Sequence, residues 1–526
     1  MDPHLRARTT ELHTEEPHAG LCETAAMSLP VASSTATERY EAVIGIEVHC
    51  QLKTESKMFC GCSTAYDGAE PNTHTCPVCL GLPGALPTIN RRAVELVLTA
   101  GAAIGSTTPA ATRWDRKNYF YPDLPKGYQI SQYDLPLAAR GSLTIDTSDG
   151  PFTIGITRAH LEEDTAKLVH APGPNGERLS LVDFNRSGAP LMEIVTEPDI
   201  RTAEQARRYA EELQLLLRAI GASDADMERG QMRVEANVSL RQRGTEPFGT
   251  RVEVKNMNSF RSVERAITFE IERQAAIIDA GDTLVMETRG WSDDRGETYR
   301  MRAKETSDDY RYFPEPDLPP LRVDPAWLAE LVAALPEVPS ARRARYRETL
   351  GLSRYDATVL VADPDASRLF EAALASDPDS DAKTVANWVT GEYLRIRNAK
   401  LPEAGTGRPE LLGDPAELAV LIRLVSDGTI SRANAKEVFE AHLSMGESVT
   451  SIIAARGLAQ ISDVGALGAI VDAVIAANPA AAADVAAGKA QAIGFLVGQV
   501  MKETRGQANA AVVQAAIRSR LGNGAA

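Results

Sequence analysis

The chain has 526 residues, of which 44% are hydrophobic, and its formal net charge is −16. This length exceeds what one hydrophobic core usually serves, so two to four domains are expected. The negative charge excludes a protein that coats nucleic acid non-specifically, because such binding needs clustered Lys and Arg, and any RNA contact must come from local basic patches. No apolar stretch approaches the roughly 20 residues of a membrane span, so no membrane partner is expected.

Residues 1–37 are rich in Ala, Thr, Glu and His and lack the hydrophobic segment of a secretory signal. We expect a disordered N-terminal extension here, with Met27 as an alternative start of the chain. Four of the six cysteines fall within twenty residues, unlike the dispersed cysteines of a secreted disulfide framework. The sequence therefore predicts a reducing, cytoplasmic location.

Residues 38–322 alternate strand patterns, turns and a few helices, among them Ala203–Ile220 and Ser262–Ala280. Three strand patterns place apolar side chains on one face and reactive polar groups on the other, because strand side chains repeat every two residues. The polar faces carry Glu47, His49 and Gln51 in the first pattern, Arg233, Glu235, Asn237 and Ser239 in the second, and Arg251, Glu253 and Lys255 in the third. Three such faces predict one polar cavity, where we place the chemistry.

Two cysteine pairs lie within this region, as Cys60-Gly61-Cys62 and Cys76-Pro77-Val78-Cys79. Four thiolates satisfy tetrahedral zinc and leave no open position, so the spacing predicts a structural zinc knuckle over residues 60–79, with His74 as the reserve ligand. Four free buried cysteines or a redox C-x-x-C are the alternatives. The paired spacing argues against four free buried cysteines. The presence of a second cysteine pair nearby argues against a redox C-x-x-C.

Two further segments carry candidate chemistry. Asp115–Gln132 combines aromatic rings, cations and turn residues, which suits base stacking and phosphate neutralisation, although Tyr-Pro loops often only cover a core. One of the successive acids Glu162–Asp164 can join Glu47, His49 and Glu253 around a hard cation such as Mg²⁺, although a charged turn is the plainer interpretation. No P-loop or G-x-G-x-x-G motif is present, so any nucleotide site has another design.

The chain after Pro325 is predicted to be helical, because its apolar positions recur every three to four residues. The expected helices are Trp327–Leu335, Ser340–Leu350, a helix around Ser367–Ala375, Thr384–Ile396 and Asp414–Ser426, with a loop at Leu401–Asp414. We expect an α+β fold: a catalytic domain that combines strands and helices (38–322), an all-α domain (323–450) and a region of shorter, Ala-rich helices (451–526).

The last forty residues are locally basic. They contain one acid, Glu503, against five cations: Lys489, Lys502, Arg505, Arg518 and Arg520. Cations near helix C-termini complement the helix dipole, and a basic terminal domain is also a candidate for RNA phosphate contacts. Both interpretations stay open on the sequence.

Eight ordered motifs resemble the B-subunit family of bacterial aspartyl/glutamyl-tRNA(Asn/Gln) amidotransferases. They are Ile44–His49, Asp115–Gln132, Arg158–Asp164, Leu181–Arg186, Pro190–Asp199, Val252–Ser259, Asp308–Pro316 and Gly494–Gln499. The resemblance covers the chain from about Tyr40 to the C-terminus. It implies a catalytic cradle with a mixed or antiparallel sheet, a helical domain and a small helical, tRNA-binding tail similar to YqeY-type proteins, with a YqeY-like region over about 361–526.

The implied function is that of an amidating subunit, a carbon–nitrogen ligase with glutamine as amido donor. ATP would phosphorylate the side-chain carboxylate of Glu-tRNA(Gln) or Asp-tRNA(Asn), and ammonia would then displace the phosphate to give Gln-tRNA(Gln) or Asn-tRNA(Asn). The ammonia would come from a glutaminase A subunit, and a small C subunit would complete a heterotrimer. The expected cofactors are ATP, Mg²⁺ and structural Zn²⁺.

Roles for single residues also follow from this resemblance. The expected Mg²⁺ ligands are His49, Glu163 and Glu253, with Glu47 as a fourth or water-mediated ligand. The expected phosphate or carboxylate contacts are Lys117, Arg158 and Lys255. The expected nucleotide and substrate contacts are Asn118, Tyr119, Tyr121, Tyr128, Gln132, Glu235, Asn237 and Asn256, and the tail cations named above are expected to contact tRNA.

Two other functions remain as hypotheses. A non-catalytic tRNA-binding scaffold would show no effect of the strand-face residues on ATP turnover. A stand-alone ligase that uses free ammonia would amidate its substrate without a partner. The chain shows neither an amidase Ser/Lys signature nor a Cys–His glutaminase arrangement, because Cys22 lies in the N-terminal extension and Cys50 on the apolar strand face.

Overall fold

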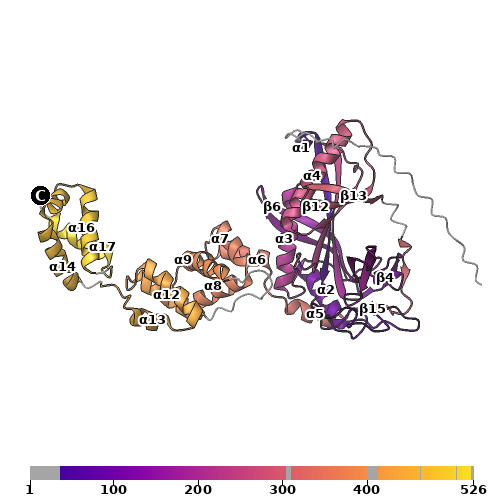
Figure 1. Cartoon of the computed structure of the whole chain (residues 1–526), viewed down its shortest axis with the longest axis horizontal. Helices are drawn as coiled ribbons and strands as arrows, with labels where there is room; N and C mark the ends of the chain where they lie inside the picture. Colours follow the sequence, from indigo (N-terminus) through magenta and orange to yellow (C-terminus); the bar gives the residue numbers. More distant parts are fainter. Residues whose placement is uncertain (1–35, 304–309, 401–412, 462–463, 505, 523–526) are drawn as a thin grey trace, which may run out of the picture.

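The computed structural model describes residues 36–303, 310–400, 413–461, 464–504 and 506–522 (Figure 1). The predictions for residues 1–35, including Met27, lie outside these ranges. A part built on a large sheet is followed by a middle group and a terminal group of helices, arranged along the long axis of the molecule (Figure 1). The expected α+β class is confirmed.

An eight-stranded sheet forms the first part, in the order β13-β12-β11-β10-β1-β9-β6-β5. All neighbours are antiparallel except β11 and β12, so the sheet is mixed. The strands are β1 (Tyr40–Gln51), β5 (Ala138–Thr147), β6 (Gly150–Glu163), β9 (Pro190–Thr196), β10 (Met232–Gln242), β11 (Val252–Met257), β12 (Glu287–Ser292) and β13 (Glu297–Ala303).

Helices cover one face of this sheet because that face carries its apolar side chains. Ile44, Ile46 and Val48 of β1 are fully buried there, in one core with Tyr209 and Ile267. The covering helices are α2 (Arg91–Ala103), α3 (Ala203–Ala219) and α4 (Phe260–Asp279). The helices predicted at Ala203–Ile220 and Ser262–Ala280 are thus confirmed to within two residues.

The opposite, polar face of the sheet is bordered by a three-stranded sheet in the order β14-β3-β4. Its strands are β3 (Asp115–Asn118), β4 (Tyr128–Ser131) and β14 (Phe313–Pro314). The smaller elements are α1 (Ala36–Arg39), the pair β2 (Ala111–Thr112) and β15 (Leu321–Arg322), and the hairpin β7 (Lys167–Pro172) and β8 (Arg178–Asp183).

The middle helices enclose a second hydrophobic core that runs from Tyr346 to Ile453. Helix α5 (Pro325–Ala333) precedes them and packs on the first core. The middle helices are α6 (Pro339–Glu348), α7 (Arg354–Ala362), α8 (Pro364–Ser376), α9 (Ala382–Asn387), the π-helix η2 (Trp388–Tyr393), α10 (Leu394–Ala399), α11 (Pro415–Ser426), α12 (Arg432–Met445) and α13 (Val449–Arg456). The five helices predicted after Pro325 are present. Residues 401–412 of the predicted loop Leu401–Asp414 lie outside the described residues.

A third core, from Leu467 to Ile517, joins the terminal helices α14 (Val464–Ala477), α15 (Pro479–Ala486), α16 (Ala490–Glu503) and α17 (Ala510–Leu521). The predicted domain divisions stay predictions, and the cores show which side chains pack together near them. Side chains up to Val338 pack on the first core, beyond the predicted division at 322/323. The division predicted at 450/451 falls inside α13, which contributes Ile452 and Ile453 to the second core.

No single helix in the described ranges is long and apolar enough to cross a membrane. One pair of segments, Leu467–Ala477 and Pro479–Ala486, reaches the required length and composition only when taken together, and it is bent by 101°.

Candidate active site

A cavity of about 1010 Å³ lies on the polar face of the large sheet. Its lining comes from strands that are far apart in the sequence, namely β1, β6, β9, β10 and β11, and from β3 and residues 310–312. The three polar faces expected from the sequence therefore meet. Glu47, His49, Glu235, Glu253 and Lys255 all line the cavity.

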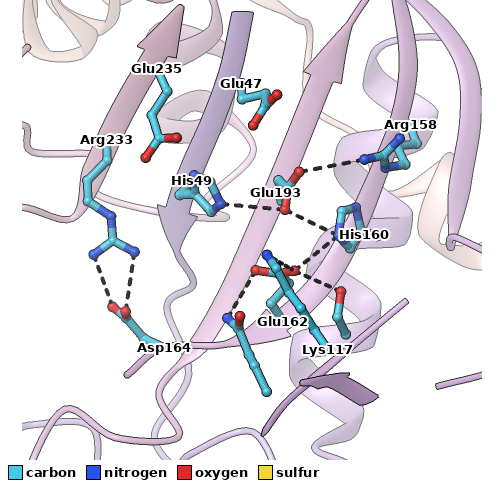
Figure 2. A network of polar contacts seen from close by, with 12 residues as sticks. Glu47, His49, Lys117, Arg158, His160, Glu162, Asp164, Glu193, Arg233 and Glu235 are labelled. Carbon is cyan, nitrogen blue, oxygen red and sulfur yellow. Dashed lines mark hydrogen bonds and ion pairs between the residues drawn. The ribbon is translucent and has the colours of Figure 1, made fainter. Parts of the chain in front are cut away.

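Strand register builds a row of charged and imidazole groups across four strands. Arg233 of β10 pairs with His49 of β1, His49 with Glu193 of β9, and Glu193 with His160 of β6. Directly paired residues project from the same face of a sheet, and Figure 2 shows His49, Glu193 and His160 side by side. Backbone hydrogen bonds thus fix this row before any ligand is present.

Glu193 is the centre of the row, with a carboxylate that is only 8% exposed. His49 Nε2 and His160 Nε2 each lie 3.5 Å from Glu193 Oε2, and Arg158 lies 3.8 Å from Oε1 (Figure 2). Burial alone would raise the pKa of Glu193, but the two imidazoles and Lys117 outweigh burial and hold this pKa well below its usual range. In turn Glu193 overcomes the burial of His49 and raises the pKa of His49.

Glu162 is held firmly at the next position of the cavity wall. Its carboxylate accepts hydrogen bonds from Ser131 Oγ at 2.7 Å and Gln129 Nε2 at 3.0 Å, and Lys117 Nζ lies 3.6 Å away. Although burial opposes ionisation, Lys117 helps to lower the pKa of Glu162, and Glu162 with Glu193 raises the pKa of Lys117 well above its usual value. This part of the cavity therefore keeps both charges at neutral pH.

Two groups of acidic and imidazole side chains could hold a metal ion in this cavity. Within each group, one possible ligand atom from each residue lies within 4.8 Å of the others. One group is His49, Glu162 and Glu193, and the second is Glu47, Glu235 and Glu253.

The second group carries the larger excess of negative charge. Its cationic neighbour is Lys255, whose Nζ lies 2.6 Å from Glu235 and 3.6 Å from Glu253, and Asn237 donates a hydrogen bond of 2.8 Å to Glu47. Burial and the neighbouring carboxylates Glu193 and Glu235 raise the pKa of Glu47. A divalent cation would relieve this repulsion, so oxygen ligands and charge both fit Mg²⁺ here.

Five of the residues predicted for the metal, nucleotide and substrate sites do not line the cavity: Glu163, Tyr128, Gln132, Asn237 and Asn256. Glu163 follows Glu162 on β6, so its side chain points the other way, where it pairs with Lys126 and accepts a hydrogen bond from Ile130 N at 3.0 Å. The expected trio of His49, Glu163 and Glu253 is therefore not brought together, and Glu235 stands where Glu163 was expected.

Tyr128, Gln132 and Asn256 have structural contacts outside the cavity. The guanidinium carbon of Arg116 lies over the Tyr128 ring, 4.1 Å from the ring centroid. Gln132 is fully buried and bonds to Thr112 Oγ1 and Leu161 N. Asn256 has a positive φ of 64° and donates a hydrogen bond to the Tyr299 hydroxyl at 3.1 Å.

The remaining predicted residues lie at the cavity. Lys117, Asn118, Tyr119, Tyr121 and Arg158 line it. Asn237 is not part of the lining but reaches the cavity through Glu47, and its Oδ1 is buried without a hydrogen-bond partner among the described residues.

Sequence reasoning missed Glu193 and His160 as site residues. Glu193 is the single charged residue in β9, which is buried on both faces and so lacks the alternation that marked the other strands. His160 alternates with Arg158 and Glu162 along β6. The same period-2 pattern could have identified it.

The four predicted zinc ligands converge. Possible ligand atoms of Cys60, Cys62, Cys76 and Cys79 lie within 4.8 Å of one another, as tetrahedral sulfur coordination requires. The hydrogen bond with the Cys60 thiol outweighs burial and lowers the pKa of Cys79 to about 4. Buried Lys57 places Nζ 3.6 Å from the Cys79 sulfur, which favours a thiolate. His74, the reserve ligand, is not part of this group.

The tail cations differ in how much they are engaged. Lys489 pairs with Asp484 at 2.7 Å, and Arg520 pairs with Asp472. Lys502 and Arg518 have no ion pair among the described residues, and Arg505 lies outside them.

Comparison with known proteins identifies the family to which the sequence is similar. Residues 42–329 match the model of the GatB/GatE catalytic domain, and residues 368–521 match the GatB domain. Similar proteins carry the name of the B subunit of aspartyl/glutamyl-tRNA(Asn/Gln) amidotransferase. The one from Moorella thermoacetica is 52% identical over 482 residues, which cover 92% of this chain and 100% of that protein. The one from Carboxydothermus hydrogenoformans is 50% identical, with 92% and 99% covered.

Proposed function

Because the chain belongs to the family of aspartyl/glutamyl-tRNA(Asn/Gln) amidotransferase B subunits, we propose that it is the amidating subunit of a glutamine-dependent enzyme. Its substrates are ATP and Glu-tRNA(Gln), Asp-tRNA(Asn) or both. The observation that carries this proposal is the cavity itself, where two acidic groups face Lys117, Arg158 and Lys255 in a chain of this family.

The reaction has two steps. A side-chain carboxylate oxygen of the esterified amino acid attacks the γ-phosphorus of ATP, and ADP leaves. Ammonia then attacks the acyl carbon, phosphate leaves, and a proton is lost to give the amide. A carboxylate is a poor electrophile until it is phosphorylated, so the protein mainly positions two anions and stabilises their charge.

The cations of the cavity suit this task. Lys117 lies 3.6 Å from Glu162 and Arg158 lies 3.8 Å from Glu193, both longer than a hydrogen bond. Their donors therefore remain open to phosphate or carboxylate oxygens. Lys255 is closer to its partner, Glu235, and we assign it to orient the acidic group as well as to contact substrate.

We assign Glu47, Glu235 and Glu253 as the residues that would hold Mg²⁺, with His49, two residues from Glu47 on the same face of β1, as a further ligand. Magnesium, when bound, offsets the charge on the transferred phosphoryl group. Glu162 is less suited, because Ser131 and Gln129 already occupy its oxygens.

We also propose a structural zinc ion at the four cysteines, away from the chemistry. The ammonia would come from a glutaminase A subunit, and a small C subunit would complete a heterotrimer in the cytoplasm. The names of the related proteins support a multi-subunit enzyme acting with tRNA. Lys502 and Arg518 are the tail cations most available for RNA phosphates.

The deciding experiment compares Glu253→Gln with Glu163→Gln in the purified complex. Glu253→Gln removes one negative charge from the proposed metal site, so phosphorylation of Glu-tRNA should fall about 100-fold or more while glutaminase activity persists. Glu163→Gln loses a buried pair with Lys126, so it should lower thermal stability and change the Mg²⁺ dependence little. An unaltered phosphorylation rate in Glu253→Gln would refute the assignment.

A further inference from the structure

A solvent-exposed phenylalanine side chain lies at the edge of the candidate active site. Phe120 is 81% exposed, the highest value among the large hydrophobic side chains of the described residues, and Tyr121 beside it is 60% exposed. Both side chains line the active-site cavity. They also line a shallow groove of about 370 Å³ together with Pro122, Leu124, Pro125 and Gly127. The groove and the cavity therefore share an aromatic wall.

The loop that carries this ring is held in place. Leu124 is buried, Tyr119 N donates to Gly127 O at 3.1 Å, and Ala166 N donates to Asp123 O at 2.9 Å. Lys126 closes the loop by pairing with buried Glu163. The exposure of Phe120 is thus a property of an anchored loop.

The Phe120 ring also packs against the backbone of Gly127. Gly127 has a φ of +74°, and a Cβ at this position would lie 3.1 Å from the Phe120 ring. The ring therefore packs against the bare backbone of Gly127, and the rest of its surface faces the groove and solvent. A ring fixed in this way loses little entropy when a flat partner stacks on it.

We propose that Phe120 stacks on an unpaired nucleobase at the 3′ end of the aminoacyl-tRNA. This inference rests on the proposed function, in which the reacting carboxylate is attached to the terminal ribose. The terminal nucleotides must then lie at the cavity mouth, where Phe120 and Tyr121 are. Single-stranded RNA ends are typically recognised by aromatic rings on which bases stack, with cations nearby for the phosphates.

The surroundings favour RNA over two other occupants. The groove shares Phe120 and Tyr121 with a cavity whose lining includes the cations Lys117, Arg158 and Arg311, and such cations suit a polyanion that extends along both. A docking face for a protein partner would be expected to continue into a wider apolar patch. The adenine of ATP is chemically equivalent to a 3′-terminal adenine, so the experiment must separate these two sources.

The test uses the complete complex with Phe120→Leu, Phe120→Trp and the control Phe248→Leu. Phe248 is 65% exposed and does not line the cavity. Loss of the ring in Phe120→Leu should raise KM for aminoacyl-tRNA about tenfold, as expected for the loss of one base-stacking contact. The KM for ATP should stay unchanged, and Phe120→Trp, which keeps an aromatic face, should retain a low KM for tRNA.

A binding measurement separates this inference from the proposed function. With 2-aminopurine as the 3′-terminal base of the tRNA, stacking should quench its fluorescence in the unaltered complex and in Phe248→Leu, but much less in Phe120→Leu. This signal needs no turnover, so it is informative even if phosphorylation fails. The inference is overturned if Phe120→Leu leaves quenching and KM for tRNA unchanged, if it raises KM for ATP instead, or if it breaks assembly with the partner subunits.

Discussion

Asp164 shows how one buried charge ties the site to the stability of the sheet. Its carboxylate is 3% exposed and lies 3.2 Å from Arg233 and 3.7 Å from Arg186, and Gln51 donates a hydrogen bond to it at 2.9 Å. Burial opposes its ionisation, but the two guanidinium groups outweigh burial and lower the pKa of Asp164 to about 2. Folding therefore stabilises the ionised form of Asp164 relative to the protonated form.

This shift predicts a pH-dependent stability. Because the folded pKa lies below the ordinary value of 3.8, the contribution of Asp164 is present above about pH 4 and is lost as pH falls toward 2. It amounts to about 2 kcal/mol. Urea unfolding of Asp164→Asn should show a deficit of at least this size at pH 7 that narrows below pH 4. An equal deficit at pH 7 and pH 3 would contradict the electrostatic origin.

At the residue scale, the sequence predicted those site residues that alternate along amphipathic strands. The pattern identified Glu47, His49, Glu235 and Glu253. In each case the next residue along the strand is apolar and points to the opposite face of the sheet. Glu193 gave no such signal in its doubly buried strand. The choice of Glu163 over its neighbours came from resemblance, and a one-residue step along a strand reverses the side-chain direction.

At the scale of elements, the cysteine knuckle braces a loop that leads into the site. Met58 N donates to Gly188 O at 2.7 Å, and the Ser187 hydroxyl donates to Cys79 O at 3.2 Å. Gly188 N donates in turn to Asp164 O at 2.8 Å. The knuckle thus holds the segment before β9, and its effect on the site is through the backbone.

Zinc removal is therefore expected to act on stability first. Chelation, or Cys62→Ala, should lower the unfolding temperature of the sheet part by about 5 °C or more, because metal binding free energy is also folding free energy. Cys50→Ala is the matched control, since Cys50 is buried on the apolar face and outside the thiol group. Calorimetry with a zinc assay checks this, and loss of one zinc equivalent in Cys50→Ala would contradict the ligand set.

Helices were predicted well at this scale because their signals are local. Thr202 caps α3 through a capping box with Gln205, as its sequence indicates. The order of the eight strands could not be predicted in the same way, since pairings such as β1 with β10 join residues about 190 positions apart. The aromatic segment 310–312 reached the cavity by a similarly long-range contact.

At the scale of the whole molecule, a buried ion pair joins the middle helices to the sheet part. Arg343 of α6 lies 2.6 Å from Glu212 of α3, and both side chains are 9% exposed. Arg354 adds a hydrogen bond of 2.8 Å to Thr147 O. These two contacts join the middle helices α6 and α7 to α3 and β5 of the sheet part.

The terminal helices can be removed without cutting the second core, because Leu458 is its last packed residue and Ile461 belongs to the third core. A chain that ends at residue 460 should therefore keep its sheet, its zinc and its KM for ATP. Its KM for aminoacyl-tRNA should rise about tenfold, because phosphate contacts of the tail are lost. An unchanged KM for tRNA would remove the tail from RNA binding.

Charge substitutions in the full-length chain then show whether the tail acts through its cations. Lys502→Ala with Arg518→Ala removes two groups that have no ion pair among the described residues, so tRNA affinity should fall and its dependence on salt should become shallower. Lys489→Ala with Arg520→Ala is the matched control, because both cations already pair with Asp484 and Asp472. Binding titrations at several salt concentrations measure both effects. If the control pair weakened binding as much as the first pair, the tail would hold RNA by overall charge, and its ion pairs would not restrict which cations reach the phosphates.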